Sequence, residues 1–173
     1  MRKRRGLSIA IVLFGCLLAM LLKGCFWLDA PPKVDSVQKQ FMDYRKDIHT
    51  VVEFMVHSGY ESISIDNSNG TIWADFQTIP VDDEAAKDAI ARLLSIGAYY
   101  DIYKNGNTIS FLQWKGARDI GCGIAYTINR CDLPEVQYTT ELVSINEEGW
   151  FYYVADYNKW RINEPKPSDV LAR

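Results

Sequence analysis

The spacing of apolar residues changes several times along the chain, and each spacing predicts a different element. Over residues 36–58 apolar side chains recur every three or four positions, as they do on one face of a helix. The members of this stripe are Val37, Phe41, Tyr44, Ile48, Val51 and Met55. The pattern predicts one long helix, with Asp35 and Gln38 as a capping pair at its start and Gly59 as its stop.

Two segments predict β-hairpins. Residues 60–66 and 71–76 alternate apolar with polar side chains, as strands with one buried face do. The face expected to be buried in the second of these strands comprises Ile72, Ala74 and Phe76. Asn69-Gly70 lies between the two strands and favours a tight turn, because both residue types tolerate the backbone angles that such a turn needs. Residues 99–114 repeat the arrangement around Asn105-Gly106.

A second helix is expected between Pro80 and Gly97. Its apolar stripe comprises Ala86, Ala89, Ile90, Leu93 and Ile96. Three more strand-like runs follow, at residues 123–129, 136–145 and 150–155. Hairpins with helices between them predict an α+β domain with a mainly antiparallel sheet and two helices on one face.

The N-terminus predicts export across a membrane. Residues 1–5 are rich in positive charge, and residues 6–22 then form an uncharged apolar run. A basic segment followed by an apolar one is typical of a signal sequence or a membrane-anchor helix. Because positive charges stay on the cytoplasmic side, the rest of the chain is expected at the cell membrane, on the extracytoplasmic side.

Two modes of attachment are compatible with this segment. Leu22-Lys23-Gly24-Cys25 resembles a bacterial lipobox, and the resemblance implies that Cys25 is the site of lipid attachment. The alternative is an uncleaved helix over residues 6–28, in which the Lys23 side chain reaches the headgroups. Both place the following residues on the same side of the membrane.

The chain is expected to have one folded domain behind this segment. The expected parts are a signal peptide or anchor at 1–28, a linker at 29–34, a domain at 35–161 and a disordered tail at 162–173. All 22 acidic residues lie after Cys25, with 14 of the 19 lysines and arginines, so this part carries a net charge of −8. Such a domain repels phosphate backbones, and nucleic acid is not an expected partner.

Two segments contain residue types that can bind metal ions. The spacing of these residues does not fit a metal site in either segment. His49, Glu53 and His57 share one helical stripe, but a helix separates the two histidines by about 12 Å along its axis. This is too far for one ion with ligand bonds near ~2 Å. Residues 66–72 have the composition of a calcium loop but not its spacing, and a hairpin turn explains them. No metal or cofactor is expected.

Cys122 and Cys131 are the cysteines of the expected domain. Residues 124–128 between them alternate as a strand does, and such a strand would separate the two Cα atoms by roughly 30 Å. A disulfide requires less than about 7 Å, so a bond between these cysteines is not favoured unless the segment bends back.

The densest aromatic segment covers residues 150–160. It is interpreted either as a strand buried on both faces or as an aromatic platform that binds a partner. In the second interpretation the binding surface comprises Trp150, Tyr152, Tyr153, Tyr157 and Trp160.

These observations favour a membrane-anchored binding or accessory domain outside the cytoplasmic membrane, which presents a surface to an envelope protein or a saccharide. The alternative is a small cell-wall or saccharide-directed hydrolase that uses acidic residues near the aromatic strand. The chain lacks the sequence motifs of a serine-hydrolase elbow, a zinc protease or a phosphate-binding loop, so catalysis is the weaker hypothesis.

Overall fold

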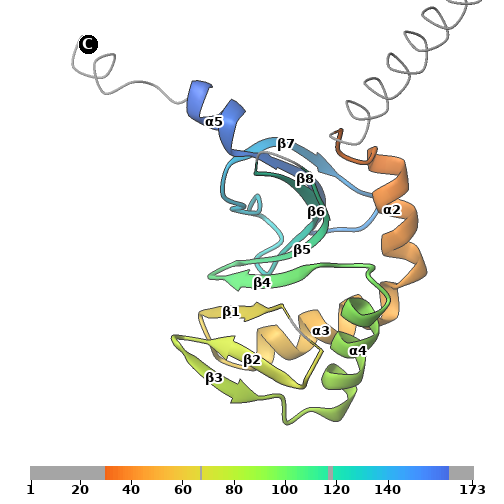
Figure 1. Ribbon diagram of the computed structural model, residues 1–173, viewed down its shortest axis with the longest axis vertical. Helices are drawn as coiled ribbons and strands as arrows, with labels where there is room; N and C mark the ends of the chain where they lie inside the picture. Colours follow the sequence, from red (N-terminus) through yellow and green to blue (C-terminus); the bar gives the residue numbers. More distant parts are fainter. Residues whose placement is uncertain (1–29, 67, 117–118, 164–173) are drawn as a thin grey trace, which may run out of the picture. The chain divides into compact units, whose positions relative to one another are not determined.

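An antiparallel sheet with helices on one side is the framework of the domain (Figure 1). The computed structural model describes residues 30–66, 68–116 and 119–163. The sheet has eight strands in the order β3-β2-β1-β4-β5-β6-β8-β7. The predicted α+β class with an antiparallel sheet is confirmed. The predicted signal or anchor helix lies outside the described residues.

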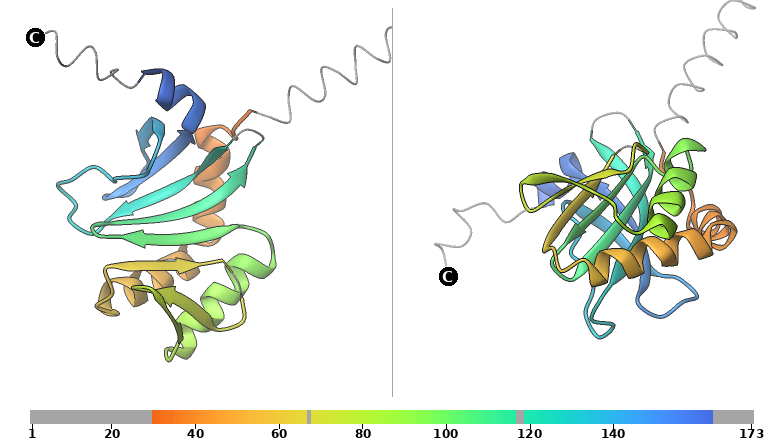
Figure 2. Two further views of the ribbon diagram at one scale, coloured as in Figure 1. Left: turned by 60° about the vertical axis from the view of Figure 1, so that its left-hand side comes forward. Right: turned by 90° about the horizontal axis from the view of Figure 1, so that it is seen from below.

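The described elements follow the chain order helix, strands, helix, strands, helix. The helices are α2 (Val34–Asp43), α3 (Arg45–His57), α4 (Glu84–Ser95) and α5 (Tyr157–Asn163). The first four strands are β1 (Ser62–Ile65), β2 (Thr71–Ala74), β3 (Gln77–Pro80) and β4 (Asp101–Asn105). The others are β5 (Thr108–Lys115), β6 (Ile120–Thr127), β7 (Thr139–Ser144) and β8 (Trp150–Asp156). Figure 2 shows α2, α3 and α4 on the same side of the sheet.

The long helix expected over residues 36–58 is broken into two. The break is at Tyr44, whose φ of −112° and ψ of 14° are not helical. It lets α2 pack against β6 and β8 while α3 packs against α4. The expected capping pair is also wrong, because Lys33 is the N-cap of α2 and no side chain caps it. The apolar spacing could not reveal the break, since the same stripe continues on both sides of it.

The first hairpin carries a third strand that the apolar pattern does not predict. Ala74 pairs with Gln77, so Asp75 and Phe76 form a two-residue turn, with φ of 42° and 70°. Phe76 was expected on the buried face of the strand, but it is 91% exposed at this turn. The carboxylate of Asp75 accepts a hydrogen bond from the Ser62 backbone N–H at 2.8 Å, which holds the turn against β1.

The second helix and the second hairpin are confirmed. The Asp83 side chain caps α4 by accepting a hydrogen bond from the Ala86 N–H, and Gly97 follows the helix with φ of 68°. Asn105 pairs with Thr108, so that the turn between β4 and β5 has two residues. The three later strands also form, although β6 begins three residues before the expected position and β7 three residues after it.

The sheet bends sharply where β5 meets β6 (Figure 1). The register shifts between Leu112 and Trp114, which marks a bulge in β5. Opposite it, a Cβ atom on Gly123 would lie 1.9 Å from the Phe111 carbonyl oxygen, so only glycine fits this close approach. On the face away from the helices, Trp73 of β2 and Tyr103 of β4 are exposed, whereas Tyr153 of β8 is buried.

The core lies between the helices and the sheet. It includes Ile63, Ile72, Ile102 and Phe111 from the strands, all almost completely buried. Lys104 also points to this side and is only 6% exposed. Its ammonium group donates hydrogen bonds to the carbonyl oxygens of Met55 at 2.7 Å and Tyr60 at 2.6 Å. It thereby satisfies carbonyl groups at the end of α3 and in the connection to β1.

Candidate binding surface

Three of the five aromatic residues expected on a binding surface lie in the core. Trp150, Tyr152 and Tyr153 are 1%, 2% and 3% exposed. The ring of Trp150 packs against Phe41 with a centroid distance of 4.8 Å, and the Tyr152 hydroxyl donates a hydrogen bond to the Pro32 carbonyl at 3.0 Å. The surface interpretation is therefore corrected for these three side chains. They form a strand that is covered on both faces, as the other interpretation of this segment proposed.

The remaining two aromatic residues lie on α5. Tyr157 and Trp160 are half-buried and stack on each other, with ring centroids 6.3 Å apart. Both also contact Tyr138, at centroid distances of 4.9 and 5.0 Å. This cluster lies beyond the end of β8, so the structure separates it from the three buried aromatic residues.

The two cysteines of the domain are both free. Cys122 is buried in β6, and this burial raises the pKa of its thiol to about 12. Cys131 is exposed in the segment that connects β6 to β7. Cys25, the expected lipid-attachment site, lies outside the described residues.

The side chains of His49 and His57 have different partners and do not form one site with Glu53. The His57 Nδ1 lies 2.8 Å from the Glu53 carbonyl oxygen, one turn earlier in α3. The His49 Nε2 lies 2.7 Å from the Glu147 carboxylate, which comes from the connection between β7 and β8. In the part of the chain that the structure describes, no three His, Cys, Asp or Glu side chains are grouped to hold a metal ion.

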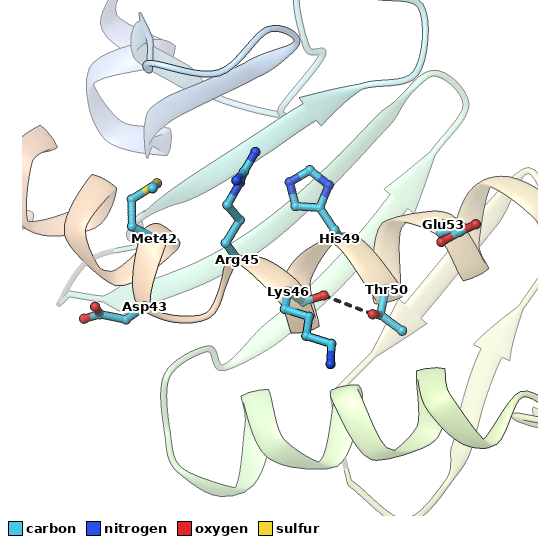
Figure 3. Close-up of a pocket in the computed structure, with 7 residues that line it drawn as sticks. All are labelled: Met42, Asp43, Arg45, Lys46, His49, Thr50 and Glu53. Carbon is cyan, nitrogen blue, oxygen red and sulfur yellow. Dashed lines mark hydrogen bonds between the residues drawn. The ribbon is translucent and has the colours of Figure 1, made fainter.

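A shallow hollow of about 550 Å³ lies along α2 and α3 (Figure 3). It is lined by Met42, Asp43, Arg45, Lys46, His49, Thr50 and Glu53. Figure 3 shows the Arg45 and His49 side chains pointing to the same side of the helix. Both are engaged by Glu147, whose carboxylate lies 2.8 Å from the Arg45 Nε and 2.7 Å from His49. The contacts of Glu147 attach the loop between β7 and β8 to α3. The Arg45 Nε and the His49 Nε2 are therefore already paired and are not available to a ligand.

The open face of the sheet presents a different set of side chains. Ser64 of β1 pairs with Trp73 of β2 on one side and with Tyr103 of β4 on the other. The same line continues to Thr78 of β3 and Ser110 of β5. We call these five residues the aromatic–hydroxyl row. Residues paired across adjacent strands point to the same face, so their side chains lie side by side.

Two large aromatic side chains of this row are exposed to solvent. Trp73 is 51% exposed and Tyr103 is 41% exposed. Adjacent strands lie about 4.8 Å apart, which separates the two rings by about 10 Å with Ser64 between them. The five side chains carry hydroxyl groups or aromatic rings and no charge. Because they stand on paired strands, their spacing is held by backbone hydrogen bonds.

Strand alternation explains why these residues face outward. Ile63, Ile72 and Ile102 point to the helices, so the residues beside them in sequence point to the opposite face. A sequence signal for the row was present, since Trp73 occupies an outward position between Ile72 and Ala74. It was weaker than the aromatic density of residues 150–160, three of whose aromatic side chains are buried.

A small hollow of about 170 Å³ adjoins Tyr103 on the same face. It is lined by Tyr103, Asn105, Thr108, Ser110, Leu112, Glu135, Val136, Gln137, Tyr153 and Ala155. Residues 135–137 lie over the sheet here, and the Glu135 N–H donates a hydrogen bond to the Thr108 hydroxyl at 2.8 Å. Sites for whole ligands usually measure about 300–1,000 Å³. This hollow is therefore suited to one side chain or one sugar ring of a larger ligand.

Asp101 lies on the same strand and face as Tyr103, two residues earlier. Burial raises the pKa of its carboxyl group, the charge of Lys115 opposes this shift, and the charge of Asp66 adds to it. One carboxylate oxygen of Asp101 is buried without a hydrogen bond from the described residues. The open face thus also holds a carboxyl group that is more easily protonated than usual.

Comparison with models of protein families, with curated proteins and with solved structures finds no match to this chain. The function must therefore be argued from the residues of the site.

Proposed function

We propose that this chain is a membrane-anchored extracytoplasmic domain that binds an envelope saccharide or protein on its aromatic–hydroxyl row. The observation that carries the proposal is the pair of exposed rings, Trp73 and Tyr103, on either side of Ser64 in paired strands. Rigid aromatic side chains lose little conformational freedom on binding, and they are frequent anchors of binding surfaces. The hydroxyl groups between them can donate and accept hydrogen bonds.

The chemistry of the row favours a neutral polar ligand over a highly charged one. None of its five side chains can form an ion pair. A saccharide presents apolar ring faces and hydroxyl groups, which match the aromatic rings and the Ser and Thr side chains of the row. The adjoining hollow of about 170 Å³ can take one further group of the same ligand. A polar protein loop meets the same requirements less completely.

The N-terminal sequence supports the anchoring part of the proposal. Its basic residues and its apolar run are typical of an export signal or an anchor, and both modes of attachment place the domain outside the cytoplasmic membrane. Among residues 30–66, 68–116 and 119–163 no helix is both long enough and apolar enough to cross a membrane. The expected anchor precedes these residues.

The test is capture of envelope components by the full chain and by a Trp73→Ala, Tyr103→Ala double variant. Tyr100→Ala is the matched control, because Tyr100 is 56% exposed and lies outside the row. Loss of one aromatic anchor typically costs about 2 kcal/mol of binding free energy, or about 30-fold in affinity. We expect the double variant to lose at least this much and the control to bind as the original chain does.

The outcome also separates the two candidate functions. A saccharide or protein that is retained unchanged supports binding. A glycan that is cleaved while bound supports the hydrolase alternative. Equal capture by the original chain and by the double variant contradicts the proposed surface.

A further inference from the structure

The α5 helix carries a second group of exposed apolar and aromatic side chains. Ile162 is 76% exposed, and Tyr138, which packs against the helix, is 39% exposed. Tyr138 has a φ of 60°, which is uncommon for a bulky residue. Its ring contacts Tyr157 and Trp160 edge-on. The three rings form one aromatic cluster, and Ile162 adds an exposed aliphatic side chain on the same helix.

The exposed charges on α5 itself are positive. Lys159 and Arg161 are exposed, and α5 contains no acidic residue. The Lys159 ammonium group lies 3.7 Å from the carboxylate of Asp156, which is buried. This contrasts with the net charge of −8 that the chain carries after Cys25. We call Tyr138, Tyr157, Lys159, Trp160, Arg161 and Ile162 the α5 patch.

The α5 patch lies at the end of the domain where the N-terminal segment joins. The Tyr152 hydroxyl binds the Pro32 carbonyl, and β8, which contains Tyr152, leads directly into α5. Figures 1 and 2 show α5 and the beginning of α2 at the same end of the sheet. The strands that carry Ser64, Trp73 and Tyr103 of the aromatic–hydroxyl row, β1, β2 and β4, lie toward the other end (Figure 1).

We propose that the α5 patch lies against the surface of the lipid bilayer and orients the domain on it. This inference rests on the membrane anchoring in the proposed function. Trp and Tyr side chains are enriched at membrane–water interfaces, where an apolar ring and a polar group are both satisfied. Lys and Arg beside them are attracted to anionic headgroups, which the rest of the acidic domain repels.

The proposed contact has a consequence for the binding surface. With α5 on the bilayer, the strands that carry Trp73 and Tyr103 lie toward the end of the domain away from the membrane (Figure 1). The row is then accessible to envelope ligands while the chain remains attached at its N-terminus. The contact is formed by residues that the N-terminal anchor does not include, so it can be tested separately.

The experiment reconstitutes the full chain in vesicles of phosphatidylcholine and phosphatidylglycerol with brominated acyl chains, which quench nearby tryptophan fluorescence. Trp160→Phe isolates the signal of Trp160 from that of the other tryptophans. We expect the original chain to lose more fluorescence than this variant does. Ile162→Glu should reduce the quenching of Trp160 at least twofold, because a carboxylate opposes insertion among anionic headgroups. Ile96→Glu is the matched control, since Ile96 is 55% exposed directly after α4, and it should leave the quenching unchanged.

Each outcome of this experiment either supports or contradicts the proposed membrane contact. Equal quenching of the original chain and Trp160→Phe overturns it, as does equal quenching of the Ile162→Glu and Ile96→Glu variants. Flotation of the same vesicles reports on anchoring. A chain that floats without quenching of Trp160 overturns only the contact of the α5 patch. A chain that does not float overturns the anchoring and the contact together.

Discussion

Two aromatic regions of this domain differ in their exposure to solvent. The segment at β8 is rich in aromatic residues, and Trp150, Tyr152 and Tyr153 are buried there. The strands β2 and β4 contribute two aromatic side chains, Trp73 and Tyr103, to the open face, and both are exposed. Aromatic density along the sequence therefore does not identify a surface. What decides exposure is whether another element covers that face of the strand.

The largest difference between the two regions is expected in stability. Trp150→Ala removes a buried ring that packs against Phe41 and Tyr126, and substitutions of this kind cost about 3–5 kcal/mol. Trp73→Ala should change the free energy of unfolding by no more than ~0.5 kcal/mol, as exposed positions usually do. Chemical denaturation of both variants measures the difference. Similar losses would show that the two regions are not distinct.

The two faces of strand β4 also differ. Lys104 and Tyr103 are neighbours on β4, but the Lys104 ammonium group is buried and donates to two backbone carbonyls. Lys104→Met keeps the apolar stem and leaves both carbonyls without this donor, at a cost of about 1–3 kcal/mol. Lys39→Met, at an exposed position of α2, should have little effect on the thermal midpoint. A Lys104→Met variant as stable as the Lys39→Met control would contradict this role.

A smaller effect is expected at Asp101, on the open face. Burial raises the pKa of Asp101 above its ordinary value of 3.8, so the folded state binds its proton more tightly than the unfolded state. The contribution of Asp101 therefore stabilises the fold at low pH and is lost as the pH rises from about 3.8 through the raised pKa. Asp101→Asn should increase stability at neutral pH by less than ~1 kcal/mol.

The measurement for Asp101 is the pH dependence of the thermal midpoint. The gain in the Asp101→Asn variant should shrink as the pH falls through the raised pKa toward 3.8, and it should be lost below 3.8, where the original carboxyl group is protonated in both states. A gain that stays constant from acid to neutral pH would mean that the substitution acts through packing and not through the charge. Lys115 opposes the shift, so removing its charge should enlarge the gain.

Apolar periodicity predicts most of this fold, because it records which side chains the core requires. It predicts α4, both hairpins and the later strands, whose buried faces follow simple alternation or helical spacing. It fails at Tyr44, where a break changes the direction of the helix without changing the spacing. It also fails at Asp75 and Phe76, whose turn lacks the glycine that usually marks such a conformation.

The candidate site is less predictable than the fold for a physical reason. The exposure of Trp73 and Tyr103 depends on the path of the helices and of residues 135–137, which cover other parts of the sheet. Strand alternation shows that Trp73 lies opposite Ile72, but it does not show which face is open. The burial of Trp150 likewise depends on α2, which is more than 100 residues away in sequence.

The most direct test of the central claim places a charge in the middle of the row. Ser64→Arg adds a long cationic side chain between Trp73 and Tyr103 and leaves both rings in place. The thermal midpoint should stay nearly unchanged, because Ser64 is on the open face and half-buried. Affinity for the captured ligand should fall at least tenfold, measured by titration of the full chain. Unchanged affinity in a folded Ser64→Arg variant would contradict the assignment of the row as the binding surface.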